Sequence, residues 1–368
     1  MNHSTKTKQA DRKFLIYLFV LVVFGLVALT SASGPSGYEK FGDSYFYVKR
    51  QILFGLLPGL VGFLVLARIP YHIWQKFSLW VYGITLVLLI LVFVPGMGIV
   101  INGSHSWLAL GNFTFQSSEL AKLAVIIMAA HLLSDPKRDL TDWKNGLLPI
   151  LAILAPALIL VLLQPDIGTL SILVVIIFMM LYLAKIPKSF LAVLGALAAI
   201  AFVGLMLLAP YRVQRLTTFL HPELDPKGVG YHINQAFLAV GSGGVWGLGL
   251  GHSRQKFQYL PEVDADSIFA VIAEETGFIF SVCLVVLILL FSWRGLSIAS
   301  AAPDLFGKLL SGGIMVWFFW QSFLNIGAMV GAVPLTGVPL PFISHGGSAL
   351  AIALASMGMV ASVSRNNY

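Results

Sequence analysis

The chain has 368 residues, of which 58% are hydrophobic and only 11% are charged, and its formal net charge is +7. Soluble domains carry about 25% charged residues, so this composition excludes an ordinary soluble globule. The positive charge does not indicate nucleic-acid binding either, because the Lys and Arg residues are scattered over many short segments.

Long apolar runs alternate with short polar segments along the whole chain. Each run reaches the length of about 20 residues that a helix needs to cross the hydrocarbon core, and continuous apolarity argues against a membrane barrel. We therefore predict an all-α, polytopic integral membrane protein with about ten transmembrane helices. The expected spans are residues 14–31, 51–67, 77–100, 118–133, 146–163, 168–184, 189–208, 267–292, 309–330 and 346–362.

The polar segments predict the topology. Residues 1–13 are basic and predict a cytoplasmic start, and the basic loop 134–145 predicts a second cytoplasmic segment. Ten spans return the chain to the same side, so we expect an N-in and C-in protein in which residues 14–364 form one membrane domain and residues 365–368 a cytoplasmic end. The stretch 211–265, between the seventh and eighth spans, is the expected large extracytoplasmic loop.

An acidic segment, YLPEVDADSIFAVIAEETG, covers residues 259–277 and enters the eighth span. Asp266 and Ser267 stand where an N-cap residue belongs, and capping would explain one of them. Capping does not explain Glu262 and Asp264 as well, nor Glu274 and Glu275 at a depth where a carboxylate is costly. We interpret Asp266 as a functional carboxylate, and leave Glu274 and Glu275 between function and pairing with buried polar groups.

Further polar residues have both a structural and a functional interpretation. Ser117 or Ser118 predicts an N-cap, and Lys122 follows about one turn inside that helix. Lys122 either returns its ammonium group to the interface or pairs with a carboxylate or a phosphate. Arg50 suits an interfacial anchor, and Asp166 suits a turn residue as well as a site residue.

Several signatures are missing or misleading. The segment GSGGVWGLGLG, residues 241–251, follows no strand and has no P-loop Lys, so it predicts close helix packing or a re-entrant segment and not a nucleotide site. The polar segment 101–118 carries aromatic residues and suits the membrane interface. The His residues show no metal-ligand spacing, and the single cysteine, Cys283, excludes an intrachain disulfide.

Five blocks of sequence together resemble the SEDS family (shape, elongation, division and sporulation), whose members FtsW and RodA polymerise peptidoglycan glycan strands. They lie in the same order along nearly the whole chain. Asp264 stands where the family commonly has His, Ser106 where many members have Arg, and His345 where Tyr is usual. The blocks are KRQ at 49–51, W-x-x-L-G with FQSSELAKLA at 107–124, QPDIGT at 164–169, GYHINQAFLAVGSGGVWGLGLGHSRQKFQYLPEVDADSIFAVIAEETGF at 230–278 and PLTGVPLPFISHGGSAL at 334–350.

The resemblance, which is nearer to FtsW than to RodA, implies a peptidoglycan glycosyltransferase that uses lipid II. Asp266 falls on the family's essential aspartate and is the expected general base, with a pKa raised by partial burial. The leaving pyrophosphate needs cations, for which we expect Lys122 and Arg254 first, among Lys49, Arg50, Arg212, Arg215 and Lys256, or a divalent cation, Mg²⁺ or Mn²⁺. The expected substrate site comprises Lys122, Arg254, Lys49, Arg50, Glu119, Trp107, Asp166, Glu262, Ser344 and His345.

The same resemblance implies a class B penicillin-binding protein as partner, other division proteins around it, and an active site open to membrane lipid. Two alternatives belong to other classes. A lipid II flippase would suit ten spans with buried charges, and a non-catalytic scaffold would leave the intramembrane carboxylates unexplained. Within the enzyme class, a RodA-type elongation polymerase is the alternative to a division enzyme.

Overall fold

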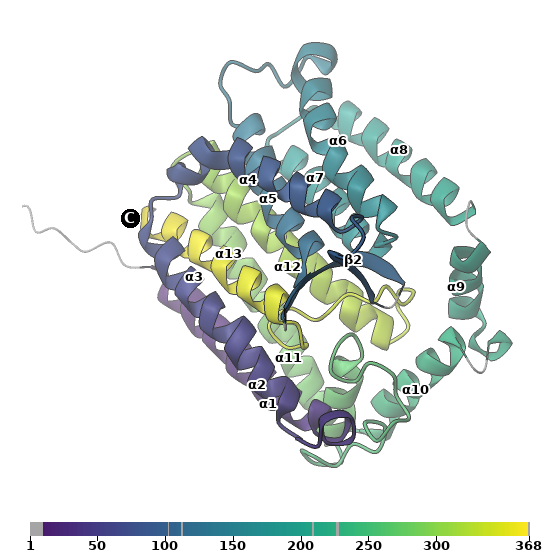
Figure 1. The fold of residues 1–368 in the computed structure, drawn as a ribbon. Helices are drawn as coiled ribbons and strands as arrows, with labels where there is room; N and C mark the ends of the chain where they lie inside the picture. Colours follow the sequence, from purple (N-terminus) through teal and green to yellow (C-terminus); the bar gives the residue numbers. More distant parts are fainter. Residues whose placement is uncertain (1–9, 102, 112, 208–209, 226–227, 367–368) are drawn as a thin grey trace, which may run out of the picture.

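The structure is a computed structural model that describes residues 10–101, 103–111, 113–207, 210–225 and 228–366. Helices make up almost all of its regular structure and pack into one bundle (Figure 1). In chain order the elements are α1 (Arg12–Phe41), α2 (Phe46–Gln51), η1 (Ile52–Leu56), α3 (Leu57–Arg68), α4 (His72–Leu91), β1 (Gly98–Ile101), β2 (Ser104–Leu110), β3 (Phe113–Gln116), α5 (Ser117–Leu133), η2 (Trp143–Leu147), α6 (Leu148–Leu163), α7 (Ile167–Leu183), α8 (Lys188–Leu207), α9 (Pro210–Leu220), η3 (Pro222–Leu224), α10 (Val229–Ser242), α11 (Ile268–Ser300), α12 (Leu305–Met329) and α13 (Gly347–Asn366).

The predicted all-α membrane architecture is confirmed. Within the described residues, eight helices are long and apolar enough to cross a membrane, and α7 is a further apolar helix of 17 residues. The helix α5 also has 17 residues, and nearly all of it is buried inside the protein. A total of ten spans stays a prediction.

The centre of the bundle is formed by α5, α12 and α13, whereas α8 lies at its rim (Figure 1). In α12 and α13, 78% of the spanning window is buried, but in α8 only 6% is. A glycine brings α3 close to the central helix α13, since a side chain on Gly59 of α3 would meet Leu354 of α13 at 2.8 Å. Close approach through glycine is a common way to pack helices in a membrane, where lipid competes for apolar surface.

The segment after α4 differs from the prediction. The expected third span, 77–100, ends early because α4 stops at Leu91 and a turn leads into strand β1. The expected interfacial segment is a three-stranded antiparallel sheet in the order β1-β2-β3, in which Trp107 pairs with Ile99 and with Gln116. The sheet is tied to the end of α6, since His105 N donates to Gln164 O at 3.2 Å.

The helix α11 is interrupted at Gly277, whose φ of 77° and ψ of −177° are not helical. The glycine-rich segment 243–249 fits into this interruption. Leu248 N and Gly249 N donate to the carbonyl oxygens of Glu274 and Glu275 at 3.0 and 2.9 Å, and Phe278 N donates to Gly244 O at 2.9 Å. The glycine-rich segment therefore provides close packing, one of its two predicted roles, and it bonds groups that the interruption removes from the helical ladder.

The expected large loop 211–265 contains regular structure. It holds α9, η3 and α10, which run along one edge of the bundle after α8 (Figure 1). From Gly251 to Ser267, which is just past the end of this loop, the chain has no helix or strand and leads directly into α11.

Candidate active site

Asp266 stands just before α11, next to Ser267, which occupies the N-cap position without making a side-chain cap bond. The Asp266 side chain is half-buried. Burial, followed by the charge of Glu262, raises the pKa of Asp266 to about 7. Both causes disfavour the ionised carboxylate. Asp266 is therefore a carboxyl that can gain or lose a proton near neutral pH, as the sequence led us to expect.

The backbone around Asp266 is held to the segment between α12 and α13. Asn325 of α12 donates from Nδ2 to Asp266 O at 2.8 Å and to Val338 O at 2.9 Å. Ser344 Oγ donates to Ala265 O at 2.5 Å. Asn325 and Ser344 are buried. These bonds fix the main chain at Ala265 and Asp266 and so position the Asp266 carboxylate, but they do not involve the carboxylate itself.

Asp264 and His345 join the same two segments. His345 N donates to Asp264 O at 2.7 Å, and His345 Nδ1 lies 3.8 Å from Asp264 Oδ2. Burial and the nearby Arg50 lower the pKa of His345 to about 4, and burial raises the pKa of Asp264. The imidazole is therefore neutral at pH 7, and the contact is not an ion pair there. Glu262, the third acidic residue of this segment, is exposed.

The K-R-Q block brings one residue into this arrangement that the predicted set omitted. Gln51 is buried, donates to Ser344 O at 3.1 Å and accepts from Gly346 N at 2.9 Å. Arg50 lies over the rings of Phe46 and Phe54. Lys49 is exposed and pairs with Asp43 at 2.7 Å. Its position inside a motif was the available signal for Gln51.

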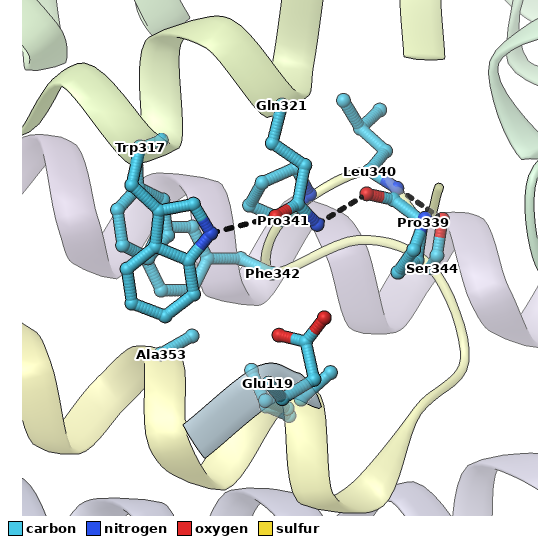
Figure 2. Close-up of a pocket in the computed structure, with 12 residues that line it drawn as sticks. Glu119, Trp317, Gln321, Pro339, Leu340, Pro341, Phe342, Ser344 and Ala353 are labelled. Carbon is cyan, nitrogen blue, oxygen red and sulfur yellow. Dashed lines mark hydrogen bonds between the residues drawn. The ribbon is translucent and has the colours of Figure 1, made fainter. Parts of the chain in front are cut away.

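Lys122 is enclosed in the centre of the bundle. Its side chain is 1% exposed, and its ammonium group contacts Glu119 Oε1 at 2.6 Å and Gln321 Oε1 at 2.8 Å, over the ring of Trp317. The interpretation that Lys122 reaches back to the interface is wrong, because a carboxylate partner is present inside the protein. Gln321 also donates to Pro339 O at 2.8 Å, which links this network to the segment that holds Asp266 (Figure 2).

A small cavity borders the Glu119 carboxylate, which points toward the segment 339–344 (Figure 2). Its volume is about 20 Å³. A volume of that size holds about one water molecule. The cavity is therefore too small for a sugar, and the network around Lys122 is a structural support in this conformation.

Asp166 and the serines before Lys122 form a second polar contact. Asp166 caps α7 by accepting from Thr169 N at 3.0 Å, and it accepts from Ser118 Oγ at 3.1 Å. The N-cap of α5 is Gln116, so the expected caps Ser117 and Ser118 are both wrong. Strand β3 runs directly into α5, and the hydroxyl of Ser117 bonds to the sheet instead, at Ser106 O.

Glu274 and Glu275 are buried and hold the loop that precedes Asp266. Glu274 accepts from Ser253 Oγ and from the backbone N–H of Arg254 at 3.0 Å. Glu275 pairs with Lys256 at 2.7 Å and accepts from Ser31 Oγ at 2.6 Å. Of their two interpretations, pairing with buried polar groups is the one observed.

Arg254 lies on the loop held by Glu274, and its side chain is exposed. It lines an open depression together with Gly251, His252, Ser253, Gln255, Phe257 and Tyr259. Arg215 of α9 is also exposed, and the side chain of Arg212 lies outside the described residues. Among the expected cations, Arg254 therefore combines an open surface with a fixed backbone.

The carboxylates near Asp266 do not assemble into a metal site. Across the described residues, no group of three or more His, Cys, Asp or Glu side chains is arranged to hold a metal ion.

The chain is similar over its full length to proteins of one family. The family described as cell cycle protein, FtsW/RodA/SpoVE, matches residues 11–368. Stage V sporulation protein E of Bacillus subtilis strain 168 is 40% identical over 98% of this chain and 99% of its own length. A probable peptidoglycan glycosyltransferase FtsW of Geobacter sp. strain M18 is 37% identical over 96% of both.

Solved structures of similar proteins also match this chain. A chain of a peptidoglycan synthase complex, studied for the coordination of polymerization and crosslinking, matches with a TM-score of 0.78 at 29% identity. The rod shape determining protein RodA of Thermus thermophilus matches with a TM-score of 0.71 at 28% identity. Each match covers 98% of both chains. The chain therefore belongs to the FtsW/RodA/SpoVE family of membrane proteins.

Proposed function

We propose that this protein is a peptidoglycan glycosyltransferase that polymerises lipid II into glycan strands at the outer face of the cytoplasmic membrane, with Asp266 as general base. The observation that carries the proposal is a half-buried carboxyl with a pKa of about 7, held through its backbone by Asn325 and Ser344. The names of two similar proteins, a probable peptidoglycan glycosyltransferase FtsW and a chain of a peptidoglycan synthase complex, support the substrate class.

The reaction sets its own requirements. The 4-hydroxyl of the acceptor sugar loses a proton as its oxygen attacks the anomeric carbon of the donor, and the bond from that carbon to the pyrophosphate breaks. A base with a pKa near the working pH combines a useful ionised fraction with the ability to accept the proton, and contributes about 10²- to 10⁴-fold. Asp266 is the carboxyl of this chain that meets that condition at the mouth of α11.

The departing pyrophosphate carries negative charge that needs a cation. We assign this role to Arg254, because its side chain is exposed while Glu274 fixes its backbone. Lys122, which we expected in the same role, is surrounded by Glu119, Gln321 and Trp317. Lys122 acts through Gln321, which bonds to the segment that carries Val338 and Ser344. The remaining candidate substrate contacts are Arg50, Lys49, Trp107, Asp166, Glu262 and His345.

The proposal includes a topology and a partner. The protein is multi-pass, with N-in and C-in ends, a single membrane domain over residues 14–364 and the active site on the outer side with the loop 211–265. A class B penicillin-binding protein would cross-link the strands as they form. Support for this partner comes from the match to a chain of a synthase complex that couples polymerization to crosslinking. Cell division, with other division proteins, is the cellular process we propose.

The test is polymerisation of labelled lipid II by the purified full chain, with and without a class B penicillin-binding protein. Asp266→Asn is compared with Asp142→Asn, which alters a partly exposed carboxylate on the loop before α6. We expect polymer from wild type and Asp142→Asn and at least a 100-fold loss in Asp266→Asn. Full activity of a folded Asp266→Asn would overturn the base assignment. Failure of the wild type with its partner, combined with lipid II translocation in sealed vesicles, would favour a flippase instead.

A further inference from the structure

Asp266 has a neighbour that the reaction as described does not use. His232, on α10, places its Nε2 atom 2.6 Å from Ser267 Oγ. Ser267 is fully buried, and its Oγ donates to Asp266 Oδ1 at 3.5 Å, the long end of the hydrogen-bond range. A line of three side chains therefore runs from α10 to one oxygen of the candidate base.

One assignment of the hydrogens satisfies both contacts at once. A serine hydroxyl has one hydrogen, and Ser267 donates it to the carboxylate of Asp266. The short contact to His232 then requires the imidazole to carry its hydrogen on Nε2 and to donate to Ser267 Oγ. A neutral imidazole in this tautomer meets the requirement.

The two oxygens of Asp266 have different surroundings. Oδ1 faces Ser267, whereas Oδ2 faces Gly337, where an added Cβ would lie 3.9 Å away. Gly337 has a φ of +70°, a conformation that side chains rarely adopt, and this keeps the position next to Oδ2 without a side chain. One oxygen is thus bonded within the protein, whereas the other has no side chain beside it at Gly337.

The charges around this line keep His232 neutral. Burial, followed by the positive charge of Arg215 on α9, lowers the pKa of His232 to about 4. The other titratable or charged groups that face the site are Glu262 and Asp264 on the same loop as Asp266, Lys40 on α1, Tyr47 and Arg50 on α2, and His345 before α13. None of them stands between His232 and Ser267.

We propose that His232 and Ser267 are positioning residues for the base: neutral His232 orients the Ser267 hydroxyl so that it donates to Oδ1 of Asp266, which supports the carboxylate form and directs Oδ2 to the acceptor hydroxyl. This inference rests on the proposed role of Asp266. No proton leaves along the line, because His232 already holds a hydrogen on Nε2 and stays neutral.

Loss of the hydrogen bond from Ser267 should change the pKa of Asp266 in a known direction. A hydrogen bond to the ionised form lowers the pKa of a carboxyl, so its loss raises the pKa of Asp266 further above the ordinary value. Because the base acts when ionised, the acid limb of the rate profile moves to higher pH. A role in folding alone would reduce the rate by a similar factor at every pH.

The experiment measures initial polymerisation of labelled lipid II by the full chain in its partner complex, from about pH 5.5 to about pH 9. The variants are Ser267→Ala, His232→Ala, their double variant, and two that retain the hydrogen-bonding group, Ser267→Thr and His232→Gln. The matched control is His221→Ala, an exposed His of the same loop, which pairs with Glu223. Asp266→Asn is carried in parallel, and thermal unfolding shows that each variant is folded.

We expect Ser267→Ala and His232→Ala each to move the midpoint of the acid limb upward by about half to one pH unit, with rates close to wild type at about pH 9. The double variant should match Ser267→Ala, because the two residues act in series. Ser267→Thr, His232→Gln and His221→Ala should keep the midpoint near that of wild type.

An unchanged midpoint in folded Ser267→Ala and His232→Ala, or an equal loss at every pH, would overturn the positioning role while Asp266→Asn remains inactive. Polymerisation by Asp266→Asn at the wild-type rate would instead remove the base itself. The two failures are therefore distinguishable in one set of measurements.

Discussion

Lys256 Nζ lies 2.7 Å from Glu275 Oε1, and both side chains are almost completely shielded from solvent. The two residues come from different segments, the loop before Asp266 and the first part of α11. Their contact therefore decides where that loop sits relative to the candidate base. A buried pair of this kind depends on both members, since either one alone is an uncompensated charge.

Lys256→Met should destabilise the protein by about 3–5 kcal/mol, because it leaves the Glu275 carboxylate buried without its cation. The measurement is the thermal unfolding temperature in detergent. The double variant Lys256→Met with Glu275→Gln should recover part of the loss, and Lys49→Met, which breaks the exposed pair with Asp43, should change little. Equal unfolding temperatures for Lys256→Met and Lys49→Met would show that the buried pair contributes nothing.

Asp266→Asn should stabilise the protein at about pH 8, and it should do so much less at about pH 5. The folded pKa of Asp266, about 7, lies above the ordinary value of 3.8. The stability that goes with its raised pKa is fully present below 3.8 and is lost as the pH rises through 7. An uncharged Asn avoids that loss.

Thermal unfolding of wild type and Asp266→Asn across this range tests the sign. Glu223→Gln, an exposed carboxylate of the same outer loop, provides the control. A stabilisation by Asp266→Asn that is larger at pH 5 than at pH 8 would contradict the raised pKa.

Asn325→Leu should reduce polymerisation by about 10- to 100-fold, because the backbone of Asp266 loses the bond that fixes it to Val338. The change also leaves two carbonyl groups without that donor, so we expect a lower unfolding temperature. Ser311→Ala on the same helix is the matched control, because the buried Ser311 Oγ has no hydrogen-bond partner among the described residues. Wild-type turnover by Asn325→Leu would mean that the position of Asp266 does not depend on the hydrogen bonds of Asn325.

Gly277→Ala should prevent correct folding. An added Cβ would lie 2.3 Å from Gly247 N and 2.5 Å from Trp246 C, both backbone atoms, at a φ of +77°. Gly83→Ala in α4 is the opposite case, with nothing within 4 Å, and Ala is favoured there by about 0.5–1 kcal/mol. The yield of monodisperse protein after purification and the unfolding temperature compare the two; a well-folded Gly277→Ala would show that the glycine-rich segment can move away.

The position of the site could be predicted because charge is scarce in this chain. Asp266 stood out among five carboxylates at the start of an apolar run, and the structure places it at the mouth of α11. The existence of the helices followed from apolar length, which depends on composition more than on neighbours. Their ends were less certain, as α4 shows, because β1 takes over residues that are equally apolar.

Other features depended on contacts between distant segments. The interruption at Gly277 could not be predicted, because the apolar run continues through it and the partner is a loop about thirty residues earlier. Gln321 and Asn325 did leave a signal, since polar amides inside an apolar helix are costly unless they bond to something. No signal in the sequence distinguished His232 from the other His residues, because its proposed role depends on the contact between α10 and Ser267.

The interruption at Gly277 also bears on how the chain enters the membrane. Residues 278–300 alone give 23 residues of helix, enough to cross about 30 Å of hydrocarbon. The part of α11 that carries Glu274 and Glu275 then does not have to enter the lipid with its two carboxylates unpaired. It can dock against Ser253 and Lys256 after the span is already in place. The position of the acidic half of α11 then depends on packing against the loop before Asp266 and not on partition into lipid.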